Sequence, residues 1–362
     1  MSTPRLRVAV VGGGIGTQHI DALLKLPELY EPAAFCDIDA ARAGAVAERY
    51  GIPAALTSFD ELIARDDIDV VDVCTPSGLH AAQTRAALGA GKHVICEKPL
   101  AASLAEVDGL AALERSTGRH VSPIFQYRFG NGFRRLLHLR DRALLGKTYL
   151  ATVETHWRRG AKYYAAPWRG RFATELGGCL VTHAIHAHDM LVHALGPIRS
   201  VHARTATRVN PIETEDCAVL SLEMADGALA ALSVTMGAAV EHSRLRFYFE
   251  RITVESNLTA YRPHLEPWRF EPADEAARAE IEAAFADYAP TPEHFEGQFS
   301  RLHAALTAGG PPPVTVADSR VSIELLTAAY WSARTGETVT LPIGPDHPYY
   351  HGWHDAPGGR DG

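Results

Sequence analysis

The sequence predicts an α/β domain with a doubly wound parallel sheet, followed by an α+β domain with a large, mainly antiparallel, open-faced sheet. Up to residue 124, short apolar runs alternate with amphipathic stretches, which is typical of parallel strands joined by right-handed helical crossovers. After about residue 128, strand-like runs follow one another without long helices between them, which is typical of antiparallel sheets. Because 362 residues are too many for one compact core, we expect domains at 1–126 and 127–345 and a tail at 346–362.

The first domain is predicted from five buried strands and the helices between them. The strands are short apolar runs, and the helical stretches repeat apolar residues at a spacing of three to four. The strands are predicted at 6–11, 32–36, 70–74, 93–96 and 120–124, and the helices at 19–25, 40–50, 80–90 and 104–116.

The second domain is predicted from longer strands and a few helices. We expect helices at 180–195, 291–308 and 319–334 to cover one face of its sheet. The other face must then find a partner or be polar, so we expect oligomerisation through the open sheet. The strands are predicted at 149–156, 201–208, 218–224, 229–236 and 245–249, a basic helix at 133–145, and an insertion with a short helix at 257–292.

Composition excludes several classes of protein. A net charge of −8 argues against a nucleic-acid surface, and no apolar run reaches the length of a membrane span. The first residues lack the pattern of a secretory signal, so we expect a cytoplasmic protein. The five cysteines lack C-x-x-C spacing, which predicts reduced, packed thiols and no zinc site.

A glycine-rich loop follows the first strand and opens the first helix. Gly12, Gly14 and Gly16, with Ile15 between the last two, would let the backbone approach a pyrophosphate at a helix N-terminus. The spacing departs from G-x-G-x-x-G, because Thr17 stands where the last glycine would be. The loop predicts a Rossmann-type dinucleotide-binding domain, with a tight turn that binds nothing as the alternative.

An aspartate at the end of the second strand strengthens this interpretation. Asp37 lies at the distance from the glycines at which a carboxylate binds the adenosine ribose hydroxyls. A carboxylate there repels the additional phosphate of NADP, so NAD is favoured, although Arg42 one turn later leaves NADP open. The alternative role for Asp37 is capping the helix that begins near residue 40.

Polar groups also follow two other strands of this sheet. Thr75 and Pro76 end the third strand, with His80 beyond them, and Glu97 and Lys98 end the fourth. The carboxyl ends of parallel strands share one edge, beside the crevice where a nicotinamide binds. A lysine there can hydrogen-bond a substrate hydroxyl and exchange its proton. Taken alone, a lysine in this position is more commonly a solvated residue.

The ordered set of glycine loop, Asp37, Thr75-Pro76 and Glu97-Lys98-Pro99 resembles the Gfo/Idh/MocA family, named for glucose–fructose oxidoreductase and inositol dehydrogenase. This resemblance implies a dinucleotide-binding domain, an open-faced sheet domain, and action on sugars or cyclitols. A homodimer or homotetramer, formed here through the open sheet, is implied as well. It also implies cofactor contacts by the strand-end residues, including Thr75, Pro76, His80, Glu97 and Lys98, and by Gln126, Trp168 and Arg169. Later segments extend it over nearly the whole chain: Gln126-Tyr-Arg128-Phe, Gly146-Lys-Thr-Tyr, Pro167-Trp168-Arg169-Gly170, Glu175-Leu-Gly177-Gly178, Thr182-His183-Ala-Ile-His186 and Ser332-Ala-Arg-Thr-Gly336.

Three histidines and an aspartate fall within one predicted helix. Thr182, His183 and His186 share one side of it at α-helical spacing. The resemblance implies no metal there and makes His186 the substrate-facing acid/base, whereas a structural histidine is the alternative. Inositol dehydrogenase-like members carry an aspartate where Thr182 stands, so Asp189, His183 or water would have to replace that partner of His186.

An aromatic and basic stretch precedes the histidine helix. Trp157 and Tyr164 suit stacking on a pyranose ring, and Arg158 and Arg128 suit polyhydroxylated or anionic groups. We therefore expect Lys98, Arg128, Trp157, Arg158, Tyr164, Thr182, His183 and His186 to contact the substrate. A solvated basic loop is the alternative for the stretch around Trp157.

Together these features predict an NAD-dependent oxidoreductase that transfers a hydride between nicotinamide and a secondary hydroxyl carbon of a carbohydrate or cyclitol. Lys98 and His186 would grip the same hydroxyl, and the sequence leaves open which of them takes its proton. Two alternatives remain. One is an NAD-dependent redox glycosidase that works by oxidation, elimination and reduction, and the other is a dinucleotide-binding regulatory protein without catalysis.

Overall fold

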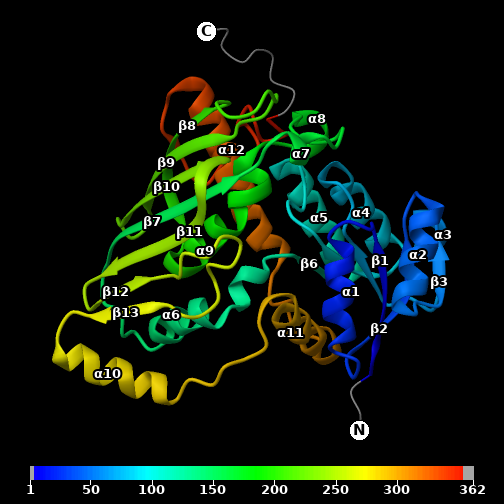
Figure 1. The fold of residues 1–362 in the computed structure, drawn as a ribbon, viewed down its shortest axis with the longest axis horizontal. Helices are drawn as coiled ribbons and strands as arrows, with labels where there is room; N and C mark the ends of the chain where they lie inside the picture. Colours follow the sequence, from blue (N-terminus) through cyan, green and yellow to red (C-terminus); the bar gives the residue numbers. More distant parts are fainter. Residues whose placement is uncertain (1–3, 354–362) are drawn as a thin grey trace. The chain divides into compact units, whose positions relative to one another are not determined.

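The structure is a computed structural model that describes residues 4–353, and the chain forms two compact units (Figure 1). The first unit comprises residues 4–125 and 295–321, and the second comprises residues 126–294 and 322–353. This division departs from the expected one because residues 295–321 belong with the first unit instead of the second.

The first unit contains a six-stranded, wholly parallel sheet, which confirms the predicted doubly wound fold. The strand order reverses between β1 and β4, which is where such sheets bind ligands. The strands run in the order β3 (Ala54–Leu56), β2 (Tyr30–Cys36), β1 (Leu6–Val11), β4 (Val70–Val73), β5 (His93–Cys96) and β6 (Val121–Pro123). The crossovers contain α1 (Gly16–Leu24), α2 (Ala40–Tyr50), α3 (Phe59–Ile63), the 3₁₀ turn η1 (Ser77–Leu79), α4 (His80–Gly89) and α5 (Leu104–Thr117).

One helix of the first unit comes from late in the chain. Apolar side chains of α11 (His294–Ala308) join the core formed by β1, α1 and β2. Phe299 is fully buried there, and its carbonyl oxygen accepts a hydrogen bond from the Tyr30 hydroxyl at 2.8 Å. The expectation that residues 291–308 cover the second sheet is therefore wrong: amphipathic periodicity shows that a helix has an apolar face, but not which sheet receives it.

The second unit contains an eight-stranded sheet in which neighbouring strands are antiparallel except for β7 and β10. The strand order is β13 (Arg269–Pro272), β12 (Ile252–Glu255), β11 (Gly237–Phe249), β7 (Thr148–Arg158), β10 (Leu229–Thr235), β9 (Cys217–Met224), β8 (Ile198–Ala206) and β14 (Val339–Thr340). The remaining elements are η2 (Gln126–Phe129), α6 (Asn131–Asp141), α7 (Ala161–Tyr164), α8 (Phe172–Glu175), η3 (Leu180–Ala184), α9 (Ile185–Leu195), α10 (Glu275–Ala286) and α12 (Val316–Thr335), of which α12 begins in the first unit.

The two faces of this sheet have different surroundings. Buried and partly exposed side chains alternate along β7, and α9 packs on that strand. Ser332 of α12 accepts a hydrogen bond from the backbone of Ala203 in β8 at 2.9 Å, on the covered face. On the other face, Val219 and Leu229 are more than half exposed. Association through this open face stays a prediction.

Residues 346–362 were predicted as a tail. Trp353 is buried, and its indole nitrogen donates a hydrogen bond to the carbonyl oxygen of Leu176 at 2.7 Å, so the chain is anchored up to this point. Residues 354–362 lie outside the described chain. All five cysteines are free thiols. Within residues 4–353, no helix combines the length and hydropathy of a membrane-spanning segment.

Candidate functional site

The glycine loop joins β1 to α1 with very little space around it. Gly12 has a φ of +100°, and a Cβ there would lie 2.7 Å from the carbonyl oxygen of Cys74, so only glycine fits. A Cβ on Gly16 would lie 3.0 Å from Val10 Cγ1, so Gly16 lets α1 pack closely on β1. Gly14 faces open space, and no described side chain caps α1 at Ile15. The first amides of α1 are therefore suited to bind an anion.

The carboxylate of Asp37 is held in place beside this loop. It accepts hydrogen bonds from the Gly13 amide at 2.9 Å and from Arg42 Nε and Nη2 at 2.7 and 2.6 Å. Burial raises the pKa of Asp37, but the hydrogen bonds from Arg42 and the backbone amides of Asp39 and Gly13 outweigh it, so the pKa lies below its usual value. Asp39 is the residue that caps α2, so the capping role considered for Asp37 belongs to Asp39. The Asp37 carboxylate lies beside the loop, paired with Arg42.

Two loops at the carboxyl edge of this sheet are joined by His80. Its Nδ1 lies 2.7 Å from the carbonyl oxygen of Pro99, and its Nε2 lies 2.8 Å from that of Thr75. The Thr75 hydroxyl in turn lies 2.6 Å from Gln83 Oε1. His80 was predicted to contact the cofactor, and in the structure both of its ring nitrogens face backbone carbonyls. It therefore braces the loop of Thr75-Pro76 against the loop of Lys98-Pro99.

A buried ionic network positions Glu97 and Lys98. His19 Nδ1 lies 2.9 Å from an Asp72 carboxylate oxygen, and its Nε2 lies 3.2 Å from Glu97 Oε1. The other oxygen of Glu97 accepts a hydrogen bond from the Lys98 amide at 3.1 Å. Burial lowers the pKa of His19, but Asp72 and Cys74 outweigh it and raise the pKa well above its usual value. The His19 imidazole therefore bridges β4 and the residue that precedes Lys98.

These residues of the first unit fit a nicotinamide dinucleotide. The amides around Gly14 and the start of α1 would hold the pyrophosphate, and Asp37 would hold the adenosine ribose. Thr75, Pro76, Glu97 and Lys98 lie at the carboxyl edge of the sheet, where the nicotinamide half belongs.

The histidines of the second unit lie on an irregular helix. Residues 180–184 form a π-helical turn that leads into α9, so the α-helical spacing expected over 180–195 does not hold at its start. The Thr182 hydroxyl lies 2.8 Å from the carbonyl oxygen of Gly178 and 2.6 Å from His183 Nδ1. His186 is buried, and its ring centroid lies 4.7 Å from that of Tyr127. Thr182 therefore interacts with His183, its neighbour in sequence.

Glu215 holds the start of this histidine segment. Its carboxyl group accepts hydrogen bonds from the Gly178 and Leu180 amides at 3.0–3.1 Å and from the Tyr330 hydroxyl at 3.0 Å. A Cβ on Gly178 would lie 1.8 Å from the carbonyl oxygen of Glu215, so glycine is required there. Burial raises the pKa of Glu215 from 4.5 to about 7, against the lowering effect of its hydrogen bonds.

The raised pKa of Glu215 predicts a pH dependence of stability. Between pH 4.5 and about 7 the unfolded state has lost this proton and the folded state has kept it, so raising the pH favours unfolding over that range. The effect is at most about 3 kcal/mol and ends above pH 7, where both states are ionised. Urea unfolding across this range should show the fall in the wild type, relative to Glu215→Gln. A constant difference between the two proteins would contradict the shift.

An aromatic cluster surrounds His183. The Trp157 ring lies 5.5 Å from His183 and 4.2 Å from Tyr261, and its indole nitrogen donates to Ser243 Oγ at 2.9 Å. Trp157 is buried, whereas Arg158 is exposed, because successive residues of β7 point to opposite faces. The arginine that joins the cluster is Arg159, whose guanidinium lies 5.0–5.5 Å from the rings of Trp157, Tyr163 and Tyr261.

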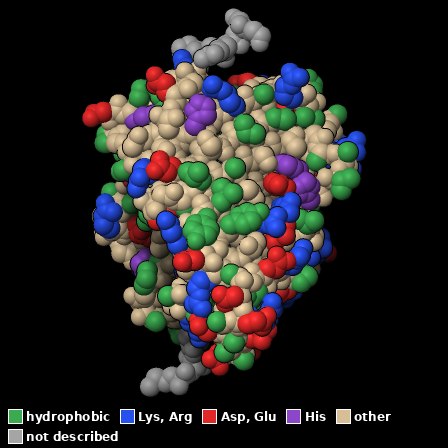
Figure 2. Space-filling view, turned by 90° about the vertical axis from the view of Figure 1, so that its left-hand side faces the viewer, with side chains coloured by type: hydrophobic (Ala, Val, Ile, Leu, Met, Phe, Trp, Pro, Cys, Tyr) green, Lys and Arg blue, Asp and Glu red, His purple; other side chains and the backbone are tan. Residues whose placement is uncertain are grey.

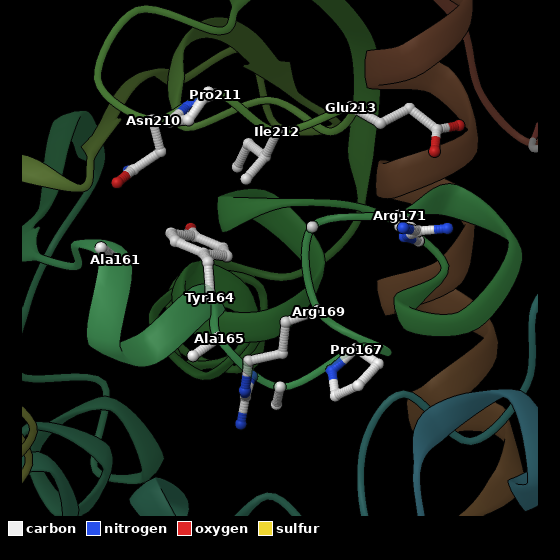
Figure 3. A pocket seen from close by; sticks show the side chains of 12 residues that line it. Ala161, Tyr164, Ala165, Pro167, Arg169, Arg171, Asn210, Pro211, Ile212 and Glu213 are labelled. Carbon is white, nitrogen blue, oxygen red and sulfur yellow. The ribbon is translucent and has the colours of Figure 1, made fainter.

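A pocket of ≈ 640 Å³ opens beside this cluster, between residues 161–171 and 210–213. Figure 3 shows the ring of Tyr164 directed toward Ile212 across it. Arg169 lines the pocket, hydrogen-bonds to Tyr163 and Glu175, and lies 4.1 Å from the Trp168 ring. Arg171, an exposed residue, also lines it. The pocket lining therefore combines one aromatic ring, that of Tyr164, with the cationic Arg169 and Arg171 and the acidic Glu213.

Arg128 and Asp189 form a buried ion pair. Arg128 Nε and Nη2 donate to the two carboxylate oxygens of Asp189 at 2.7 and 2.5 Å, and both side chains are almost wholly buried. Arg128 was expected to contact substrate, and Asp189 was considered as a partner for His186. The structure pairs these two side chains with each other. Gln126 is also buried, and its Oε1 has no hydrogen-bond partner among the described residues.

Several supporting residues were not identified from the sequence. His19, Asp72 and Glu215 are each far in sequence from the groups that they hold, so no local pattern marks them. Glu175 lies only six residues from Arg169, which it holds. The one available signal was His19, which lies three residues after Gly16 and hence on the first turn of α1.

Comparison with protein families finds two matches. Residues 6–125 match the family described as "Oxidoreductase family, NAD-binding Rossmann fold", and residues 133–255 match the "GFO/IDH/MocA C-terminal domain". Together these regions cover most of the chain.

Individual proteins are similar as well. The D-glucoside 3-dehydrogenase of Escherichia coli is 30% identical over 215 residues, which span 58% of this chain and 60% of that protein. The WlbA dehydrogenase of Chromobacterium violaceum, solved with NADH and UDP-GlcNAcA, superposes with a TM-score of 0.83 at 29% identity, covering 95% of this chain and 98% of that one. The aldose-aldose oxidoreductase of Caulobacter crescentus, solved with glycerol, gives 0.80 at 25% identity, covering 93% and 100%.

Proposed function

Because the chain belongs to the Gfo/Idh/MocA oxidoreductase family, we propose that it is an NAD-dependent dehydrogenase acting on a secondary hydroxyl carbon of a sugar, sugar derivative or cyclitol. Bound NAD supplies the hydride acceptor or donor. The observation that carries the proposal is Lys98 at the carboxyl edge of the parallel sheet, anchored through Glu97 to the buried His19–Asp72 pair. Such anchoring restricts the position of Lys98, the residue proposed to bind the substrate hydroxyl.

Lys98 and His186 are proposed to share the substrate hydroxyl. One removes its proton as the carbon is oxidised and returns it on reduction, while the other holds the oxygen in line. Histidine suits proton exchange near neutral pH because of its ordinary pKa. Ring contact with Tyr127 supports the orientation of His186 in the second unit.

We propose that the substrate carries an acidic substituent. Arg169 and Arg171 line the pocket beside the aromatic cluster, and the guanidinium group suits carboxylate and phosphate recognition. Tyr164 and Ile212 supply apolar surface for a sugar ring in the same pocket. WlbA, which is similar in sequence and fold, was solved with the acidic sugar nucleotide UDP-GlcNAcA.

The test follows the absorbance of reduced nicotinamide while matched pairs of neutral and acidic sugars, cyclitols, sugar nucleotides and aryl glycosides are offered with NAD or NADP. Products are followed by chromatography. We expect net reduction of NAD, with higher kcat/KM for the acidic member of a pair. Arg171→Gln should raise KM for the acidic sugar roughly fivefold, because one solvent-exposed charge contact contributes about 1 kcal/mol, and should leave the neutral sugar unaffected.

Each other outcome excludes part of the proposal. If the neutral and the acidic member of every pair were used equally well, the proposal that the substrate carries an acidic substituent would be wrong. NAD-dependent glycoside cleavage without net reduction would replace the dehydrogenase with a redox glycosidase. NAD binding without turnover on any substrate would favour the regulatory role.

A further inference from the structure

Three potential metal ligands meet on the open face of the second sheet. Glu154 and His156 are two residues apart in β7, so both side chains point to the same face. The register of the antiparallel pair β7/β11 places His242 directly opposite His156. The face on which these three side chains lie is the one that the helices leave uncovered. Figure 2 views the molecule from the side on which Figure 1 draws β8–β13, and histidine and acidic side chains are visible there among hydrophobic ones.

The three side chains already contact one another. His242 Nε2 lies 3.0 Å from Glu154 Oε2, and the rings of His156 and His242 are 4.8 Å apart at an angle of 76°. One ligand atom from each residue can be chosen so that all three lie within 4.8 Å of one another. In the single chain, the side chains of Glu154 and His242 are 27% and 31% exposed. They lie on the face through which association is predicted, so a bound ion would lie at that interface in an oligomer.

Two imidazoles and one carboxylate form a donor set that binds Zn²⁺ and leaves one position for water. Bonds of about 2.0–2.2 Å to a tetrahedral ion would bring the ligand atoms to roughly 3.5 Å of one another. Side-chain rotation on this accessible surface supplies that movement, because His156 Nε2 is otherwise held only by the hydroxyl of Ser233 at 2.8 Å.

The charges around the cluster are compatible with a bound cation. Arg244 lies opposite Glu154 in the register, but its guanidinium is bound to Glu255, with Nε 2.6 Å from Oε1. The carboxylate of Glu154 is therefore shared with His242 and not neutralised by an arginine contact.

We propose that Glu154, His156 and His242 form a binding site for one divalent transition-metal ion of the Zn²⁺ type. No metal was expected from the cysteine spacing or from the family resemblance. His242 is 86 residues from His156 in the chain, and only the sheet register brings them together. The site lies on the face opposite the helices that carry His183 and His186, and it is independent of the proposed dehydrogenase activity.

A second group of potential ligands does not have these properties. His19, Asp72 and Cys74 lie within hydrogen-bond distance of one another, but all three are buried in the first unit. Burial raises the pKa of the Cys74 thiol well above its usual value, which opposes the thiolate that a metal would require. That group is therefore assigned to the ionic network that anchors Glu97.

The experiment uses untagged full-length protein that has been stripped with a chelator and dialysed. Zn²⁺ binding is measured by calorimetry, and Co²⁺ is added as a spectroscopic probe whose visible absorption reports the ligand geometry. The variants are His156→Ala and His242→Ala. The matched control is His202→Ala, a partly exposed histidine on the open face in β8, opposite Ser221 and away from the cluster.

We expect one equivalent of Zn²⁺ to bind the wild type and His202→Ala with equal affinity, and each cluster variant to lose at least about tenfold, since even outer-shell changes cost 10–100-fold. Zn²⁺ should also raise the thermal midpoint of the wild type, but not that of His156→Ala. NAD binding in all variants serves as the control for folding. The proposal is overturned if the wild type binds no stoichiometric metal, or if binding persists unchanged in both cluster variants.

Discussion

Replacing Lys98 with methionine lowers kcat/KM by about 10²–10⁴-fold, the usual contribution of a positioned proton-transfer group. Methionine keeps the length and apolar stem of the side chain but removes the ammonium group. The Lys98 backbone amide would still donate to Glu97, so the loop at the end of β5 keeps its anchor. We expect the loss to appear mainly in kcat, because the group acts on the reacting hydroxyl.

Lys147→Met is the matched control for this experiment, because Lys147 is an exposed lysine that belongs neither to the residues proposed to bind NAD nor to those proposed to bind the substrate. Its kcat/KM should match that of the wild type. NAD affinity, followed by quenching of protein fluorescence, is measured in both variants. Because Lys98 is also an expected cofactor contact, this separates weaker NAD binding by Lys98→Met from a loss in kcat. A loss of less than tenfold in kcat/KM would place Lys98 outside the chemical step and leave His186 as the main candidate.

Removing one member of the Arg128–Asp189 pair produces the largest expected change in stability. Asp189→Ala leaves the guanidinium of Arg128 buried without its carboxylate partner, which typically costs 3–5 kcal/mol, so we expect a loss of about that size. Denaturation in urea measures the change. The double variant Arg128→Met/Asp189→Leu removes both charges, and we expect it to recover most of the lost stability.

A surface ion pair supplies the comparison. Arg199 and Glu223 lie 2.9 Å apart, with side chains 52% and 40% exposed, and Glu223→Ala should cost less than about 1 kcal/mol. If Asp189→Ala cost no more than this control, solvent would have to reach the guanidinium of Arg128. Its assignment as a buried structural pair would then fail, and a substrate contact by Arg128 would again be the better interpretation.

Local patterns were sufficient to predict five of the six strands of the first sheet and the cofactor loop. Parallel strands buried on both faces are continuous apolar runs, and the glycines that open α1 follow the first run directly. Asp37 and Lys98 were found because the end of each strand in a parallel sheet lies at the same edge. The three-residue strand β3 was missed because so short a run has no readable periodicity.

The second unit was harder to predict at the level of side chains. Alternation along β7 separates Trp157 from Arg158, but the sequence does not show which face receives the helices. The π-helical turn at 180–184 changes the spacing of Thr182 and His183 relative to His186, and α-helical periodicity alone does not reveal it. Arg128 was interpreted as a substrate contact because its buried partner, Asp189, is 61 residues away.

The sequence by itself determined most strands of the two sheets, the dinucleotide loop and the residues at the strand ends, because each depends on periodicity or on turn chemistry within a few residues. The short strands β3, β12, β13 and β14 were not predicted. Tertiary structure alone decided the return of α11 to the first core, the raised pKa of His19, the ion pair of Arg128 and the meeting of His156 with His242. Each of these depends on contacts between residues dozens to hundreds of positions apart. Burial and register, which set their energies, exist only once the chain has folded.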